Sequence, residues 1–438
     1  MDRFFKIRER GSSPVTEVIG GVTTFFTMAY IVIVNPSILM AGGIPFDACL
    51  TATCLSAAAT TALMGIIVNR PVALAAGMGL NAMVLGQCLI GVDWRVAMAC
   101  VLLEGVVCLA LVLLGLREAI MKAVPFSLRH SIGIGIGLFI AFMGLRDCGL
   151  VVPSESTGVA FGDITSPATI VGIVSIVLAI VLQARKVTGA LLWSIVGATV
   201  VGIPLGVTVA PDALVAGLDF SAFAAPFQAT PDGAIALLKV FTEPMLIFFV
   251  FSFLMSDFFD TMGSTLAIAK KADFATPNGD LEDARAILAV DAGGAIIGGF
   301  LGSSSVTTYI ESCAGASTGA RTGLSNLVVA GLFILCAFFA PVFGVVPVAA
   351  TSGTLVVVGY LMLAEVTVIE WKKIELALPA FFVIIGISLF SSITMGIGAG
   401  FIFHCLIMAI MGKAREVHPL MWGAAGAFLL NFLIAALM

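Results

Sequence analysis

The chain has 438 residues and a formal net charge of −5, with 60% of its residues hydrophobic and only 11% charged. Soluble domains carry roughly 25% charged residues, so this composition excludes a soluble protein and indicates a helical protein that crosses a membrane many times. The spans use up the length of the chain, and we therefore expect no separate domain outside the membrane.

Cysteine and histidine positions argue against metal or redox chemistry. The nine cysteines lie mostly inside apolar stretches, and none forms a CxxC pair. Such cysteines are typical of small buried hydrophobes. His404 has no second His or Cys at ligand spacing, and no GxxxxGK[ST] motif for ATP occurs. We expect no metal, no cofactor and no catalytic residues, and we do not expect an enzyme.

Apolar stretches that can act as membrane spans follow one another along the chain. Fourteen are predicted, at Val18–Met40, Phe46–Val68, Ala75–Gly91, Trp94–Gly115, Phe126–Leu145, Pro167–Gln183, Gly189–Val207, Pro244–Ala269, Ala286–Leu301, Ser303–Gly319, Leu324–Phe343, Val348–Ala364, Leu376–Ser391 and Met395–Met411. Several are shorter than the roughly 20 residues that a perpendicular helix needs. The last apolar stretch, Leu420–Leu437, is either a fifteenth span or an interfacial helix.

The basic residues indicate how these spans are oriented. If the N-terminus is cytoplasmic and fourteen spans alternate, all of the 21 basic residues except Arg95, Arg146 and Lys239 lie inside. The positive-inside rule expects this bias, and one missed span would reverse it for the rest of the chain. We therefore predict a multi-pass protein of the cell (inner) membrane with a cytoplasmic N-terminus.

The spans divide into seven, a polar-leaning link from Ala210 to Gly233, and seven more. An odd number per half makes the second half enter the membrane from the opposite side, which is the inverted-repeat topology of many secondary transporters. In this register the third span matches the tenth, and both are short and rich in small residues. Short spans at matching positions point to a binding site.

The tenth span carries one carboxylate, Glu311, among glycines and hydroxyl residues. A carboxylate at membrane depth is costly, so it marks a functional site by default. Thr307 and Thr308 precede it by one turn, and Gly315 follows one turn later. These small residues permit a broken helix near a ligand. We predict that Glu311 binds substrate, with Thr308 and Ile310 beside it.

The eighth span carries Asp257, Asp260 and Ser264 on one helical face. Asp260 lies ten residues before Lys270, or about 15 Å of helix rise, which places it deep in the membrane. Asp257 lies deeper still and needs a partner. A functional role is favoured for Asp260, whereas Asp257 fits a functional and a structural role equally well.

Three further polar residues lie in apolar stretches. Asn81 in the third span has an amide suited to reading a heterocyclic edge, although an interhelical bond explains it slightly better from spacing alone. Glu104 and Asp291 are the other deep acids, and either can be the structural partner of a hydroxyl or backbone group. Asn35-Pro36 interrupts the first span, because proline leaves a carbonyl without its helical partner.

Four motifs, in this order, resemble the AzgA-like branch of the nucleobase–cation symporter-2 family, which is related to the xanthine and uracil permeases. They are Gly20-Gly-Val-Thr-Thr-Phe-Phe-Thr-Met-Ala-Tyr-Ile-Val-Ile-Val-Asn-Pro36, Gly77-Met-Gly-Leu-Asn-Ala82, Asp257-Phe-Phe-Asp-Thr-Met-Gly263, and Val306-Thr-Thr-Tyr-Ile-Glu-Ser312 with Gly319-Ala-Arg-Thr-Gly323. The resemblance runs from about residue 3 to about residue 415. Departures, such as Met83-Val84 after the second motif, affect the preferred purine rather than the family.

The resemblance implies uptake of purine nucleobases (adenine, guanine or hypoxanthine) by proton symport, with sodium as an alternative coupling ion. It implies an all-α fold of fourteen spans in a 7+7 inverted repeat, with spans 3 and 10 broken into short extended segments. Its core domain would comprise residues 18–115 (spans 1–4) and 244–343 (spans 8–11), its gate domain residues 126–207 (spans 5–7) and 348–411 (spans 12–14), and 420–437 would be an extra C-terminal segment.

The family's functional residues fall on Asp260 in the eighth span, Glu311 in the tenth and Asn81 in the third. A carboxylate can accept two hydrogens from a purine at once, and a second carboxylate nearby can carry the coupling proton. We predict that Asp260 and Asn81 also bind substrate, with Asn81 tuning the choice among purines. Proton coupling is predicted at Asp260, Glu311 and Asp257, with Asp257 orienting Asp260. The expected partners are a purine and the lipid bilayer, without nucleic acid, and a homodimer is left open.

Three other functions compete with purine uptake. An anion transporter or exchanger on the same 7+7 fold would need a positive group at the broken spans, and none lies in Ser303–Gly315. A channel would need a continuous polar lining, whereas the polar residues gather at one depth. A transporter of xanthine, urate or uracil differs only in the detail of the site.

Overall fold

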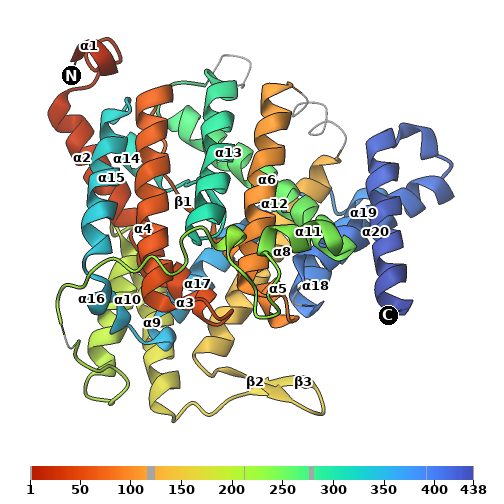
Figure 1. Cartoon of the computed structure of the whole chain (residues 1–438), viewed down its shortest axis with the longest axis horizontal. Coiled ribbons are helices and arrows are strands. Elements are labelled where there is room, and N and C mark those ends of the chain that lie inside the picture. The colour runs from red at the N-terminus through yellow and green to blue at the C-terminus, as the bar shows by residue number, and fades with distance from the viewer. Residues whose placement is uncertain (1, 116–123, 212, 276–280, 391, 438) are drawn as a thin grey trace.

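The computed structural model describes the chain except residues 1, 116–123, 212, 276–280, 391 and 438, and the described part is mostly helical (Figure 1). Its helices are α1 (Asp2–Phe5), α2 (Pro14–Met28), α3 (Ile31–Met40), α4 (Phe46–Leu63), α5 (Met78–Leu89), α6 (Trp94–Leu113), α8 (Phe126–Asp147), α9 (Pro167–Ala184), α10 (Ala190–Gly202), α11 (Ala236–Thr242), α12 (Pro244–Lys271), α13 (Ala284–Leu301), α14 (Ser312–Ser317), α15 (Leu324–Ala337), α16 (Ala340–Gly344), α17 (Val348–Leu363), α18 (Ile374–Phe390), α19 (Ile393–Ile410) and α20 (Pro419–Leu437). Its strands are β1 (Leu74–Ala76), β2 (Val151–Ser154), β3 (Gly158–Phe161) and β4 (Val306–Thr308).

Helix length and composition confirm a polytopic membrane protein. Among the described residues, 8 helical segments are long and apolar enough to cross a bilayer, and further apolar helices of 10–17 residues include α5, α10, α15 and α18. The segment 236–258 is bent by 103° between α11 and α12. The predicted Leu420–Leu437 segment is helical, as α20, and lies at one side of the molecule beside α19 (Figure 1).

Several helices begin where a capping side chain stands. Ser13 precedes α2 and accepts a hydrogen bond from the Thr16 amide, and Ser166 does the same for Thr169 before α9. Each is followed by a proline at the first helical position, where the missing N–H would have no helical partner anyway. Asp93 caps α6 by accepting from the Arg95 amide. These caps determine the residue at which each helix begins, which hydropathy alone does not define.

The third and tenth predicted spans are short and broken, as expected. Each begins with an extended segment, β1 and β4, and continues as a short helix, α5 and α14. The two strands pair antiparallel, with Leu74 opposite Thr308 and Ala76 opposite Val306. The pairing extends by one hydrogen bond at each end, from the Gly77 amide to the Ser305 carbonyl and from the Tyr309 amide to the Ala73 carbonyl. The two halves of the chain therefore meet at the centre of the bundle.

The chain reaches β4 through a tight turn after α13. Gly302 and Ser304 both have positive φ, at 90° and 79°, and a β-carbon at Gly298 would lie 2.0 Å from the Ser304 carbonyl oxygen. Glycine at 298 thus lets the backbone cross directly over α13.

The structure corrects two details of the predicted fold. The fold is not purely helical, because β1–β4 and a β2–β3 hairpin at Val151–Phe161 are present. The break in the first span lies at Ala29–Tyr30, between α2 and α3, whereas Pro36 sits inside α3. The amides after the break bond to carbonyls three residues back, as from Ile33 to Tyr30, so the local tightening of the helix occurs upstream of the proline.

The helices pack in two groups. In one, α15 contacts α2 and α4, α13 contacts α4 and α6, and α12 contacts α6; in the other, α17 contacts α8, α9 and α10, and α18 contacts α8 and α19. The N-terminus lies at one end of the molecule and the β2–β3 hairpin at the opposite end (Figure 1).

The last sequence motif, Gly319–Gly323, holds the N-terminal end of the molecule together. Buried Glu17 accepts hydrogen bonds from the Arg321 amide at 2.8 Å and the Thr322 amide at 3.3 Å. The Gly323 amide donates to the Asn69 side chain at 2.9 Å. This motif therefore connects α2, the turn at Asn69 that follows the second span, and α15, and its role here is structural.

Candidate functional site

Glu311 stands three residues after the end of β4, at the start of α14. Its carboxylate is half-buried and accepts a hydrogen bond of 2.6 Å from the Tyr30 hydroxyl. Tyr30 is 2% exposed and occupies the break between α2 and α3. A buried phenol that donates to a carboxylate fixes the position of that carboxylate. Tyr30 lies inside the first sequence motif, but the sequence does not pair it with Glu311.

Asp260 lies on α12 between fully buried Asp257 and Thr261, yet its own side chain is exposed to solvent. It interacts electrostatically with the carboxylates of Asp291 and Glu311. Ile310, beside Glu311, is 54% exposed. Asp260, Ile310 and Glu311 are therefore all accessible from outside the protein, and the interaction of Asp260 with Glu311 places these predicted site residues near one another.

Asp291 on α13 is a buried hydrogen-bond acceptor that joins three elements. One carboxylate oxygen accepts from the Thr261 hydroxyl of α12 at 2.7 Å. The other accepts from the Thr308 amide of β4 at 3.1 Å and from the Thr307 hydroxyl at 3.3 Å. The expectation that Asp291 partners a hydroxyl or backbone group is confirmed, and its place behind β4 fixes the strand that leads to Glu311.

Thr308 differs from its predicted surroundings. Its hydroxyl lies 2.7 Å from that of Ser264 and 3.3 Å from that of Thr265, both on α12, and the residue is 3% exposed. The structure therefore places this side chain in the packing between β4 and α12, and not on the solvent-exposed side with Ile310.

Asn81 on α5 is fully buried, and neither atom of its carboxamide has a hydrogen-bond partner among the described residues. A buried amide without a partner destabilises the protein by about 1–3 kcal/mol. Such an amide is expected where its hydrogen bonds are made to a bound ligand. No hydrogen bond joins it to Asp260 or Glu311 in the described part of the chain. The predicted role of Asn81 in substrate choice stays a prediction.

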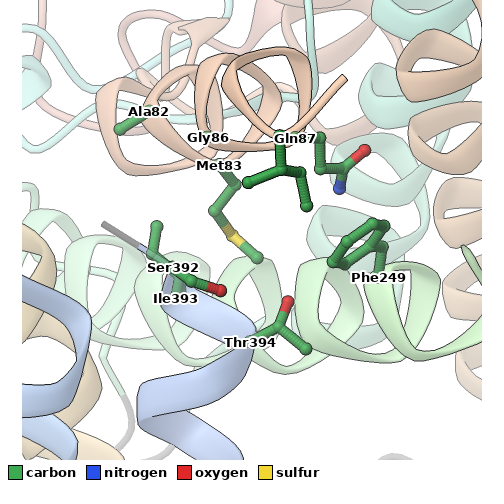
Figure 2. A pocket seen from close by; sticks show the side chains of 9 residues that line it. Ala82, Met83, Gly86, Gln87, Phe249, Ser392, Ile393 and Thr394 are labelled. Atoms are coloured by element: carbon green, nitrogen blue, oxygen red, sulfur yellow. The ribbon is translucent and has the colours of Figure 1, made fainter. Parts of the chain in front are cut away.

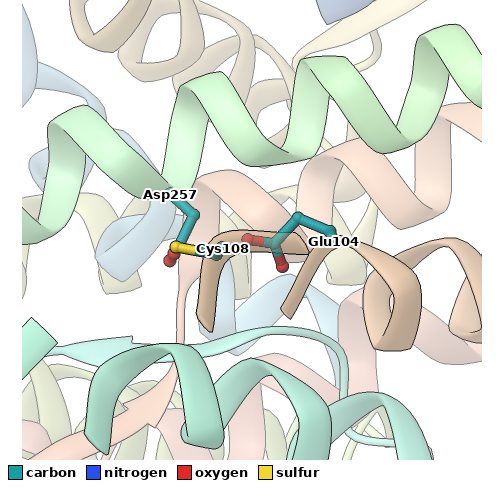
Figure 3. A group of neighbouring side chains, drawn as sticks. All are labelled: Glu104, Cys108 and Asp257. Carbon is teal, nitrogen blue, oxygen red and sulfur yellow. The ribbon is translucent and has the colours of Figure 1, made fainter. Parts of the chain in front are cut away.

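Asp257 points toward α6 (Figure 3). There its carboxylate lies with that of Glu104 and the thiol of Cys108, and the ligand atoms are all within 4.8 Å of one another. The Ser305 hydroxyl donates to Glu104 at 3.4 Å. Glu104 and Asp257 are 153 positions apart, so sequence spacing had no means of pairing them. The arrangement suits a shared proton or a cation. The predicted role of Asp257 in orienting Asp260 stays a prediction.

A separate cavity of about 640 Å³ opens beyond the far end of α5. It lies between α5, α12 and the start of α19, and a narrow recess with room for about one water leads from it toward Met83 and Gln87 (Figure 2). The sequence gives no sign of it, because its walls come from several separate spans.

Comparison with known proteins identifies the family. The model of a family described as the Permease family matches residues 15–405. The chain belongs to this family. The prediction that the permease is not an enzyme is thereby confirmed.

Curated relatives match the permease over nearly its whole length. A putative permease of Methanocaldococcus jannaschii is 38% identical over 99% of this chain and 98% of its own. A guanine/hypoxanthine permease of Bacillus subtilis is 38% identical over 99% of both chains, and an adenine permease of Escherichia coli is 38% identical over 98% of this chain and 95% of its own. The predicted resemblance to the nucleobase–cation symporter-2 family is confirmed.

Solved structures share the fold at low identity. The transmembrane domain of a cyanobacterial bicarbonate transporter superposes with a TM-score of 0.64 at 16% identity, over 87% of this chain and 96% of its own. A murine Solute Carrier 26 anion transporter gives 0.65 at 13% identity, over 91% and 68%. At these identities the likeness concerns architecture alone.

We predict that Asp291→Asn lowers the stability of the purified permease. An amide cannot accept on both sides as the carboxylate does, so at least one donor among Thr261, Thr307 and the Thr308 amide loses its bond to residue 291, at a cost of about 1–3 kcal/mol. The thermal midpoint in detergent measures this. Asp47→Asn, at an exposed aspartate of α4, is the control, and equal midpoints for the two variants would contradict the structural role.

Proposed function

We propose that this permease takes up purine nucleobases by proton symport across the cell membrane. The observation that carries the proposal is the solvent-exposed group of Asp260, Ile310 and Glu311 at the two broken spans, with Glu311 held by Tyr30. Relatives named as guanine/hypoxanthine and adenine permeases, at 38% identity over nearly the whole chain, support the substrate class.

A purine suits this site chemically. It is flat and nearly neutral, and adjacent ring N–H and amino hydrogens can donate to one carboxylate at the same time. Glu311 presents such a carboxylate in a fixed position, because one of its oxygens is held by Tyr30. A site built on these bonds rejects analogues that leave a buried polar group unpaired.

The same groups argue against the anion transporters that share the fold. Among the described residues, the charged groups that act on Asp260 are the carboxylates Asp291, Glu311 and Glu365. An anion would be repelled at such a position unless it lost its charge. A neutral base accompanied by a proton is compatible with it, and sodium remains the alternative coupling ion.

We further propose fourteen spans in a 7+7 inverted repeat with a cytoplasmic N-terminus. The eight long segments, the shorter α5, α10, α15 and α18, and the interrupted spans at α12 and α14 account for fourteen. The two packing groups support a core of spans 1–4 and 8–11 and a gate of spans 5–7 and 12–14. In this arrangement substrate lies between core and gate at the β1–β4 crossing.

Glu311→Gln is expected to abolish purine binding at the carboxylate site, and with it transport, because the amide loses the charge and one acceptor. Tyr30→Phe should weaken binding by roughly ten- to a hundredfold, since it removes one charge-assisted hydrogen bond of about 1.5–3 kcal/mol that positions Glu311. Binding of labelled adenine, guanine and hypoxanthine to purified protein measures both.

The control for these variants is Glu155→Gln, at an exposed glutamate in the β2–β3 turn. Wild-type affinity in Glu311→Gln would remove Glu311 from the binding site. No affinity of the wild-type protein for any purine would overturn the proposed function itself.

Asp260→Asn is expected to abolish concentrative uptake while exchange of bound purine persists. The reason is that a side chain that cannot change its charge cannot load the proton on one side of the membrane and release it on the other. Uptake into proteoliposomes with an imposed pH gradient is compared with counterflow without one, and Asp47→Asn serves as control. Gradient-driven accumulation by Asp260→Asn at the wild-type level would place the coupling group elsewhere.

A further inference from the structure

The cavity beyond α5 lies apart from Asp260 and Glu311. Phe249 of α12 lines both the cavity and its recess, and Asp260 follows eleven residues later on the same helix. At 1.5 Å of rise per residue, the two are about 16 Å apart along α12. No group of the proposed carboxylate site lines this cavity.

Gln87 is the residue of the recess whose side chain indicates a ligand. The residue is 4% exposed, and its carboxamide oxygen is buried without a hydrogen-bond partner among the described residues. Gln87 lines the recess, and Figure 2 shows its side chain extending from α5 toward Phe249 on α12, with Thr394 of α19 across the gap. Buried side-chain oxygens normally have a partner, so the structure leaves one polar contact to be supplied from the cavity.

The rest of the cavity fits a flat, neutral heterocycle. Phe249 and Phe390 supply aromatic surface, and Thr394 supplies a hydroxyl. The volume of about 640 Å³ lies within the range of about 300–1,000 Å³ of small-molecule sites. Lys239, Asp93 and Glu243 also line the cavity. Lys239 forms an ion pair with Asp232 at 2.6 Å and Asp93 forms one with Arg95 at 3.3 Å, so the cation already has a partner and does not draw an anion inward.

A carboxamide has a donor and an acceptor side by side, and this matches the edge of a purine. Glutamine recognises adenine in nucleic acids through such a pair of hydrogen bonds. The recess between Gln87 and the cavity has room for about one water, so the contact forms directly or through one bridging water.

We propose that this cavity is an entry subsite where a purine nucleobase first binds, with Gln87 reading its edge and Phe249 contacting its ring. The inference rests on the proposed purine transport and adds a second, earlier point of selection. It makes Gln87 and Thr394 specificity-determining residues that act before substrate reaches Glu311.

Uptake kinetics test the subsite. Gln87→Met keeps the length of the side chain and removes the amide, and we expect it to raise KM about tenfold, the effect of losing roughly 1.4 kcal/mol, while the maximal rate is largely kept. Thr394→Val should raise KM in the same direction. Gln183→Met, at an exposed glutamine of α9, should leave both parameters unchanged. Wild-type KM in both Gln87→Met and Thr394→Val would overturn the subsite.

Thiol labelling separates this site from the carboxylate site. In purified Thr394→Cys protein, the purine that the wild type transports should slow modification of the introduced thiol by a maleimide, as measured by peptide mass spectrometry. The same protection should appear in the double variant Thr394→Cys with Glu311→Gln. Loss of protection in the double variant would mean that all binding is at Glu311 and would refute the entry subsite. Absence of any purine uptake by the wild type would instead refute the proposed function.

Discussion

The structure depends on one constraint of the bilayer interior, which is that backbone amides and carbonyls must find partners inside the protein. Two spans of this chain are broken, and the break leaves backbone groups without helical partners. The extended segments β1 and β4 supply those partners to each other by pairing as strands. Thr61 completes the arrangement, because its hydroxyl bonds to both the amide and the carbonyl of Leu74. The strand pair thus makes broken helices tolerable and connects the two halves of the chain.

The acids within the spans lie in different surroundings, because the β1–β4 crossing places each of them differently. Asp291 lies behind β4 and accepts three hydrogen bonds, so it is committed to holding the strand. Glu311 and Asp260 lie where solvent reaches, which leaves them available to bind and to change charge. Asp257, less than one helical turn from Asp260, faces Glu104 and Cys108 instead. Acids on neighbouring positions of one helix therefore serve separate environments.

The shared fold does not set the substrate. The bicarbonate and anion transporters with this architecture are only 13–16% identical to the permease, and function is determined by the site built on a fold. Here the proposed site has carboxylates at the strand crossing, and an uncharged recess with an unpartnered amide at Gln87 lies farther along α5 and α12. Both features suit a base that carries hydrogen-bond donors and acceptors and no net charge.

Composition and hydropathy by themselves determined that the chain is a polytopic helical membrane protein, because apolar stretches of span length have no other stable use. Small residues around Ser303–Gly315 and Ala75–Ala82 indicated where the spans break. Asp260 and Glu311 were candidate site residues because they are carboxylates within apolar stretches. Only the tertiary structure decided which side chains meet. Tyr30 on Glu311, Asp291 on Thr261 and Thr308, and Asp257 beside Glu104 join positions from 17 to 281 residues apart. Helical spacing is a local signal and carries no information about contacts between spans. The cavity at Gln87 could not be predicted from helical spacing for the same reason, since its walls come together only when α5, α12 and α19 pack.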